Sequence, residues 1–190
     1  EILTEALQRG GRPMFALRLV LAPTLGASYG IYGPAYEHME HVPREPGSEE
    51  YLNSEKYQLR SWNLQSETSL ASQIAKVNRI RKENHALQRD HTLRFHNIEN
   101  QNIIAYSKQH ERNLVLTVAN LDVRWTQSGW VHMPLAELGL DPQQPYLVED
   151  LLNDRTWEWQ GEWNYVELNP QMTPAHIFRI TLPDAVANDG

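Results

Sequence analysis

Two imidazoles and a carboxylate lie close together in the chain, at His38, Glu40 and His41. Such side chains bind Zn²⁺, and ligands three residues apart on a helix can reach one ion. The sequence offers no second cluster of ligands, and prolines on both sides of this stretch make a helix doubtful. We therefore interpret the three residues as solvated loop side chains, and we expect neither a metal ion nor another cofactor.

Other catalytic motifs are missing from the sequence. Its 190 residues include no cysteine, which excludes thiol chemistry and disulfides. It contains no serine in a nucleophile elbow, no glycine-rich phosphate loop and no zinc-protease motif. Glycoside chemistry needs two carboxylates that converge from different elements, and spacing alone does not show convergence.

Aromatic rings are a second kind of candidate, because tryptophans can stack on sugars. Five of the six tryptophans follow residue 90. Trp157 and Trp159 are two residues apart, so a strand would place them on one face. We interpret this face as core or as a contact between domains. An exposed planar row of Trp157, Trp159 or Trp163 would instead favour a glycan-binding module.

Charge is distributed unevenly along the chain, whose net charge is −7. Residues 1–89 carry 11 basic and 10 acidic side chains, whereas residues 90–190 carry 6 and 14. Nucleic-acid binding requires a basic face, so we expect no nucleic-acid partner. Four basic neighbours are interpreted as a solvated helix face: Lys76, Arg79, Arg81 and Lys82.

The longest apolar run, residues 14–25, is interrupted by Arg18 and Pro23. It is too short to span a bilayer, and no signal peptide opens the chain. We therefore expect no membrane partner and a cytoplasmic location.

The first half of the chain begins with helical patterns. An apolar stripe over residues 2–7 predicts a helix that Gly10 and Gly11 stop. Residues 13–22 predict a second, buried helix, which Pro23 ends.

A short strand at residues 28–32 and a long polar loop follow. Ser66 or Thr68 is the expected cap of the next helix, which runs to about Leu87. Strand, loop and helix together form one step of a β/α unit. The apolar stripe of this helix consists of Leu70, Ile74, Val77, Ile80 and Leu87.

After residue 90 the apolar period changes to two, which is typical of strands. Many short strands with polar breaks predict an all-β antiparallel sandwich. A tail that follows Pro183 is expected to be frayed. The strands are expected at residues 93–95, 103–106, 114–118, 146–148, 156–159, 165–168 and 177–182.

Several stretches resemble the α-amylase superfamily near the close of its (β/α)₈ barrel. They most closely resemble the bacterial α-1,4-glucan:maltose-1-phosphate maltosyltransferases, also called maltosyl-transferring starch synthases. The string EYLxSEKY at residues 50–57 is the most specific part, although Asn53 stands where this family commonly has Asp. The resemblance covers residues 28–33 (SYGIYG), 45–60 (EPGSEEYLNSEKYQLR), 74–88 (IAKVNRIRKENHALQ), 103–108 (IIAYSK), 120–122 (NLD), 148–153 (VEDLLN), 163–170 (WNYVELNP) and 174–180 (PAHIFRI).

The resemblance implies a fold. Residues 1–89 would be the C-terminal part of the catalytic (β/α)₈ barrel, with residues 28–32 as its eighth strand. Residues 90–183 would be the C-terminal β-sandwich domain, and residues 184–190 a frayed tail. The polar loop at residues 46–60 would then lie at the face of the barrel where chemistry takes place. Because the earlier strands would precede Glu1, we expect exposed apolar surface at Phe15, Leu19 and Leu21.

The resemblance also implies a reaction. Enzymes of this family transfer maltosyl units from α-maltose 1-phosphate to an α-1,4-glucan and retain the anomeric configuration. Their Asp nucleophile, Glu acid/base and second Asp lie on the fourth, fifth and seventh barrel strands. All three would precede Glu1, so we expect no catalytic residue in this chain. The family resemblance further implies a homodimer.

Two residues carry over as substrate-binding residues, Lys56 and Tyr57, which in the family contact the maltosyl part of the donor. On the residues alone, Lys56 could instead pair with Glu50 or Glu55 on the surface while Tyr57 packs. Two other functions stay open. One is another α-amylase-superfamily hydrolase or branching enzyme, and the other is a non-catalytic carbohydrate-binding β-sandwich.

Overall fold

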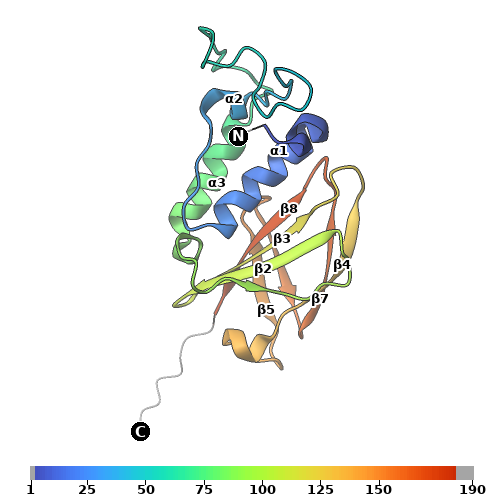
Figure 1. Cartoon of the computed structure of the whole chain (residues 1–190). Coiled ribbons are helices and arrows are strands. Elements are labelled where there is room, and N and C mark those ends of the chain that lie inside the picture. The colour runs from blue at the N-terminus through green and yellow to red at the C-terminus, as the bar shows by residue number, and fades with distance from the viewer. Residues whose placement is uncertain (1–2, 183–190) are drawn as a thin grey trace.

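The computed structural model describes residues 3–182 (Figure 1). The predicted tail, residues 184–190, lies outside the described residues. The helices are α1 (Glu5–Leu25), α2 (Gly33–Glu37) and α3 (Ala71–Glu83), with short 3₁₀ helices η1 (His85–Gln88) and η2 (Leu135–Leu138). The strands are β1 (Arg94–Phe95), β2 (Ile103–His110), β3 (Asn113–Asn120), β4 (Gln127–His132), β5 (Tyr146–Asp150), β6 (Arg155–Trp159), β7 (Trp163–Leu168) and β8 (Ala175–Thr181).

The strands form the antiparallel β-sandwich that the sequence predicts. One sheet has six strands in the order β1-β2-β3-β8-β5-β6, and β4 and β7 form a second sheet. Every pair of strands is antiparallel. Apolar side chains from the inner faces of both sheets form one core, as alternation along each strand requires. Its fully buried members include Leu114, Leu116, Val131, Val148 and Leu168.

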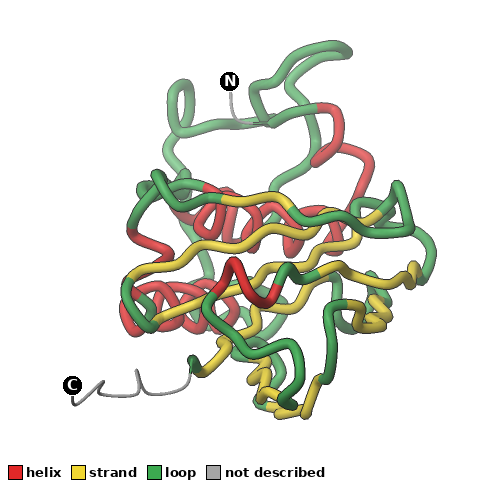
Figure 2. The backbone as a smooth tube through the Cα atoms, turned by 90° about the horizontal axis from the view of Figure 1, so that it is seen from below, coloured by secondary structure: helices red, strands yellow, loops and turns green. Residues whose placement is uncertain are grey.

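Helices α1 and α3 cover the other face of the six-stranded sheet (Figures 1 and 2). Leu17 and Val20 of α1 pack with Ile80 of α3 against Val115 and Ile177 of the sheet. A sheet buried on both faces has near-continuous apolar strands, and β3 is buried at seven of its eight residues. This contact crosses the boundary that we predict at residues 89 and 90.

A kink divides α1. Gly11 has φ 58° and ψ −161°, which a residue without a Cβ adopts readily. The predicted break at Gly10 and Gly11 is therefore confirmed. The predicted end at Pro23 is wrong, since α1 continues to Leu25. The hydroxyl groups of Thr24 and Tyr106 lie 2.6 Å apart and join the end of α1 to β2.

Two other expectations for the first half are wrong. Residues 28–32 form no strand and pair with no strand within residues 3–182. A strand needs a neighbour that completes its backbone hydrogen bonds. Neither Ser66 nor Thr68 caps α3. Their hydroxyls lie 3.1 Å from each other, and Ser69 accepts a hydrogen bond from the Ala71 amide.

Burial differs from expectation at two places. Phe15 and Leu19 are buried rather than exposed, and Leu21 is partly buried, because residues of this chain already cover them. Arg81 does not belong to a solvated helix face. Its guanidinium donates hydrogen bonds to the carbonyl oxygens of Gly26 at 3.0 Å and Ala27 at 2.6 Å.

No helix within residues 3–182 combines the length and apolarity that crossing a membrane requires.

His96 makes the stability of the sandwich depend on pH. Burial, followed by the nearby charges of Arg94 and His132, lowers the pKa of His96 from 6.5 to about 4. The neutral ring lies 2.8 Å from the Ser107 hydroxyl. Between these pKa values the unfolded chain binds a proton that the folded chain does not, so stability falls as pH falls. The full effect is about 3 kcal/mol.

We predict that His96→Gln flattens the loss of stability between about pH 6.5 and about pH 4. Chemical denaturation at several pH values measures this slope. His91→Gln, at an exposed histidine, is the matched control and should keep the wild-type slope. A remaining loss at lower pH is expected from Asp150, whose hydrogen bonds lower its pKa against the opposing effect of burial. Equal slopes for His96→Gln and wild type would contradict the prediction.

Candidate functional site

The polar loop between α2 and α3 projects away from the sheet (Figures 1 and 2). Part of it is a tight hairpin. The Arg44 amide donates to the Glu50 carbonyl at 2.8 Å, and the Leu52 amide donates to the Val42 carbonyl at 2.8 Å. Gly47 turns the chain with φ 83°. Residues 42–52 therefore have a defined backbone, although they form no long strand.

Tyr51 anchors this hairpin to the helices. Its ring is 2% exposed and packs in one cluster with Leu7 and Phe15 of α1 and Ala35 of α2. Its hydroxyl donates a hydrogen bond to Glu55, four residues further on. Burial of one aromatic ring and its tethered hydroxyl thus fixes the backbone on which the next residues stand.

Arg60 closes the loop from the other side. It forms an ion pair with Glu40 at 2.8 Å, and its guanidinium carbon lies 4.2 Å from the centre of the Trp62 ring. It also donates to the carbonyl oxygens of Leu52 and Asn53, each at 3.3 Å. A planar guanidinium suits such simultaneous contacts.

Glu50 gathers three polar side chains at the outer end of the loop. Its carboxylate lies 2.6 Å from the Lys56 ammonium, 3.2 Å from the Tyr57 hydroxyl and 3.3 Å from the Arg44 guanidinium. The Arg44 guanidinium carbon also lies 4.2 Å from the centre of the Tyr57 ring, a cation–π distance. We call these four residues, Arg44, Glu50, Lys56 and Tyr57, the Glu50 cluster.

Hydrogen bonds within the Glu50 cluster stabilise the charged forms of Arg44, Glu50 and Lys56. The hydrogen bond from Lys56 is the main cause of a lowered pKa at Glu50. The same hydrogen bond is the main cause of a raised pKa at Lys56. Hydrogen bonding to Glu50 likewise raises the pKa of Arg44. Lys56 is therefore an ammonium, and Glu50 a carboxylate, across the physiological range.

The sequence-predicted residues Lys56 and Tyr57 lie together in this cluster. Their side chains remain open to solvent, Lys56 at 62% and Tyr57 at 53% exposure. Lys56 pairs with Glu50, one of the two partners that a purely surface role would give it. An ammonium has three donors, and a phenol both donates and accepts. The pair can therefore offer donors to a polar, hydroxyl-rich ligand while Glu50 holds it in position.

Sequence reasoning offered Glu50 as a possible surface partner of Lys56, but it missed the contacts of Glu50 with Tyr57 and Arg44. Glu50 opens the EYLxSEKY string, six residues before Lys56. Such a spacing brings a carboxylate back to a lysine only when the intervening chain folds over. The aromatic residue Tyr51 beside Glu50, in an otherwise strongly polar stretch, was a signal that could have indicated this fold.

The cluster of possible metal ligands does not converge. α2 ends at Glu37, the His38 ring stacks on Trp62 at 5.3 Å, and Glu40 pairs with Arg60. Within residues 3–182, no group of three or more His, Cys, Asp or Glu side chains is arranged to hold a metal ion. His38 and Glu40 are half-buried rather than solvated.

The tryptophans form no planar row. Trp157 and Trp159 do share a face, and both rings meet Phe178 edge-on, at 5.9 Å and 5.1 Å between centres. Trp159 is nearly buried, whereas Trp157 is 37% exposed. Trp163 lies on the other sheet, tilted by 44° against His132.

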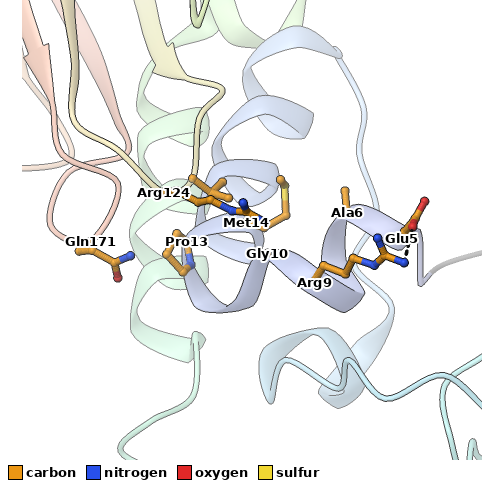
Figure 3. Close-up of a pocket in the computed structure, with 9 residues that line it drawn as sticks. Glu5, Ala6, Arg9, Gly10, Pro13, Met14, Arg124 and Gln171 are labelled. Carbon is orange, nitrogen blue, oxygen red and sulfur yellow. Dashed lines mark ion pairs between the residues drawn. The ribbon is translucent and has the colours of Figure 1, made fainter.

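A pocket of about 710 Å³ lies elsewhere, where the kink of α1 meets loops of the sandwich (Figure 3). Met14, Arg124 and Gln171 are among the residues that line it. Arg9 points away from them toward Glu5, with which it pairs at 2.8 Å. No residue of the Glu50 cluster lines this pocket, so it is separate from the candidate site.

Sequence comparisons with known proteins agree with one another. A family model described as "GLGE, C-terminal" matches residues 95–180. The chain is 49% identical over 195 residues to a protein of Chlorobaculum tepidum named alpha-1,4-glucan:maltose-1-phosphate maltosyltransferase, covering 96% of this chain and 28% of that protein. A protein of the same name from Methylacidiphilum infernorum is 44% identical over 183 residues, covering 95% of this chain and 27% of that protein. The chain thus spans about a quarter of the length of these relatives.

Among solved structures, the chain is similar to the crystal structure of a noncanonic maltogenic alpha-amylase, AmyB, from Thermotoga neapolitana. The TM-score is 0.66 at 14% sequence identity, and the match covers 91% of this chain and 38% of that one. At this identity the likeness concerns the fold alone.

The pairing of Lys56 with Glu50 is directly testable. We predict that Glu50→Gln moves the Lys56 pKa down toward its ordinary value, because the neutral amide removes the main cause of the raised pKa. NMR titration of the Lys56 ammonium measures this. Glu55→Gln is the matched control, since the Glu55 carboxylate bonds to Tyr51 instead. A Lys56 pKa that is unchanged in Glu50→Gln would mean that the pair does not form in solution.

Proposed function

Because the chain belongs to the family of α-1,4-glucan:maltose-1-phosphate maltosyltransferases, we propose that it supplies the donor-contacting loop and the C-terminal sandwich of such an enzyme. The proposed reaction transfers maltosyl units from α-maltose 1-phosphate to the non-reducing end of an α-1,4-glucan. It proceeds by double displacement and retains configuration. The observation that carries the proposal is the Glu50 cluster, which presents Lys56 and Tyr57 to solvent from an anchored loop.

In this proposal Lys56 and Tyr57 bind hydroxyl groups of the maltosyl part of the donor. Glu50 and Arg44 hold the two side chains before the sugar arrives. Binding then costs less side-chain entropy than it would with two free side chains. Tyr51 and Arg60 act further back, because they fix the backbone that carries the cluster.

Residues 1–89 would be the closing part of the catalytic barrel. Residues 28–32, which find no sheet partner within residues 3–182, would pair with barrel strands of the whole protein. The order of α2, polar loop and α3 after them supports this assignment, since barrel chemistry lies on loops that follow strands. The nucleophile, the acid/base and the stabilising carboxylate would then belong to other parts of the whole protein.

The location and the oligomeric state rest on the same proposal. A phosphorylated donor carries charge that a bilayer excludes, which favours a cytoplasmic location. The homodimer implied by the resemblance stays a prediction. A hydrolase or branching enzyme of the same superfamily would share the sandwich, but its donor would carry no phosphate.

We predict that the 190-residue chain alone neither transfers maltosyl units nor hydrolyses glucan. The physical reason is the proposed absence of a nucleophile and an acid/base pair, without which the retaining mechanism has no first step. Phosphate release from α-maltose 1-phosphate, measured against a buffer blank, is the assay. Release above the blank by the purified chain would contradict the assignment of catalysis to other parts of the protein.

We predict that Lys56→Ala in the whole protein lowers kcat/KM for α-maltose 1-phosphate by about ten- to a hundredfold. The substitution removes a charge-assisted donor to the sugar while leaving the core intact, because Lys56 is largely exposed. Lys56→Arg should not restore full activity, since a planar fork does not reproduce a compact ammonium.

Lys82→Ala is the control for this experiment, because Lys82 is an exposed lysine of α3. It should leave kcat/KM unchanged. If Lys56→Ala and Lys82→Ala behave alike, the donor-contact assignment is wrong and the loop is only a solvated connection.

A further inference from the structure

A second concave site lies on the sandwich, where the edge strand β6 approaches β7. The cleft measures about 310 Å³, near the lower end of the range of about 300–1,000 Å³ for ligand pockets. None of its lining residues belongs to the Glu50 cluster. Its lining combines aromatic rings with polar groups: Arg155, Trp157, Tyr165, Glu167, Asn169 and His176.

Two aromatic rings of this cleft are open to solvent. Trp157 is 37% and Tyr165 is 50% exposed, although large rings normally contribute to cores. Trp157 is held in place edge-on by Phe178 at 5.9 Å and by His176 at 6.0 Å. A ring that is fixed and yet exposed offers apolar surface at little cost in conformational entropy.

The aromatic surface continues from the cleft over the two-stranded sheet. Tyr165 of β7 lies opposite Trp130 of β4, with ring centres 5.7 Å apart. The next pair on the same face is Trp163 with His132, at 4.8 Å. Planes within these pairs are inclined by 64° and 44°, so the rings of a pair do not lie in one flat plane.

A buried carboxylate orients His176, one of the polar side chains that line the cleft. Asp150 is fully buried, and its carboxylate lies 2.7 Å from Nδ1 of His176. It also accepts a hydrogen bond from the Leu152 amide at 3.0 Å and another from the Asn153 side chain. The His176 ring is further stacked on Phe178 at 4.9 Å. His176 therefore stands in one orientation before any ligand arrives.

We propose that this cleft, with Trp157 and Tyr165 as its aromatic contacts, binds a segment of an α-1,4-linked glucan at a distance from the donor-contacting loop. This inference rests on the proposed function for its choice of sugar. Glucose rings have apolar C–H faces, which suit aromatic rings, and hydroxyl edges, which suit polar neighbours. A glucan is uncharged, in keeping with a lining that carries both an Arg and a Glu.

The inclination of the aromatic rings favours an α-1,4-linked glucan over a β-1,4-linked one. An α-1,4-linked chain curls, so the faces of successive glucose units turn relative to one another. Inclined rings match that shape better than they match the flat ribbon of a β-1,4-linked chain. The site would keep the polymer that is being extended close to the enzyme and so raise its effective concentration.

The test is titration calorimetry of the 190-residue chain with maltoheptaose, a linear α-1,4-glucan. The chain should bind it, and should bind cellohexaose at least about tenfold more weakly. Trp157→Ala and Tyr165→Ala should each weaken maltoheptaose binding by about tenfold or more, whereas Tyr165→Phe keeps the ring and should bind nearly as well. Trp125→Ala, at an exposed tryptophan outside the cleft, is the matched control.

Absence of maltoheptaose binding by the unsubstituted chain would overturn the inference, as would equal binding by wild type, Trp157→Ala and Tyr165→Ala. Equal binding of cellohexaose would overturn the choice of an α-1,4-glucan. Thermal unfolding checks that Trp157→Ala is folded, and if it is not, Tyr165→Ala decides. Lys56→Ala should leave this binding unchanged, so failure of the donor-contact proposal and failure of the cleft are observed in separate experiments.

Discussion

Two helices are buried against one face of a six-stranded sheet, and the other parts of the molecule are placed by that contact. The sheet is apolar on both faces, so it needs a second cover besides the two-stranded sheet. Leu17 and Val20 of α1 supply it together with Ile80 of α3. Arg81 reinforces the contact by donating to backbone carbonyl groups after the end of α1, where helical partners are missing.

The polar loop depends on the same helices. Its anchor, Tyr51, is buried in a cluster that Phe15 of α1 helps to form, two residues before Leu17, which packs against the sheet. Glu50 stands next to this anchor and holds Lys56, Tyr57 and Arg44. A chain of contacts therefore runs from the sheet, through α1, to the exposed side chains that we propose as sugar-binding. The sandwich supports the helices that orient the loop. The aromatic cleft of the sandwich is lined by a different set of side chains.

The local sequence was sufficient for elements that make their own contacts within the chain. Alternation in residues 103–106 and 114–118 predicted two strands, and the apolar stripe predicted the buried residues Val77 and Ile80 of α3. The predicted extension of this helix to Leu87 is wrong, because α3 ends at Glu83 and Leu87 lies in η1. The local sequence failed where the outcome depends on partners far away in sequence. Residues 28–32 have a strand-like composition but pair with no strand within residues 3–182. The strand β4 was missed because Ser128 and Gly129 weaken its pattern. For the site, motif resemblance identified Lys56 and Tyr57, whereas the organising role of Glu50 arises only when the hairpin brings it back to them.

The proposed function depends on whether Lys56 and Tyr57 contact the maltosyl part of the donor. A crystal structure of the whole protein with maltose in the donor site tests this directly. We expect the Lys56 ammonium and the Tyr57 hydroxyl within about 2.7–3.2 Å of maltosyl hydroxyl oxygens, with Glu50 still in contact with Lys56. Maltose bound away from the loop, with Lys56 paired to Glu50 alone, would contradict the account.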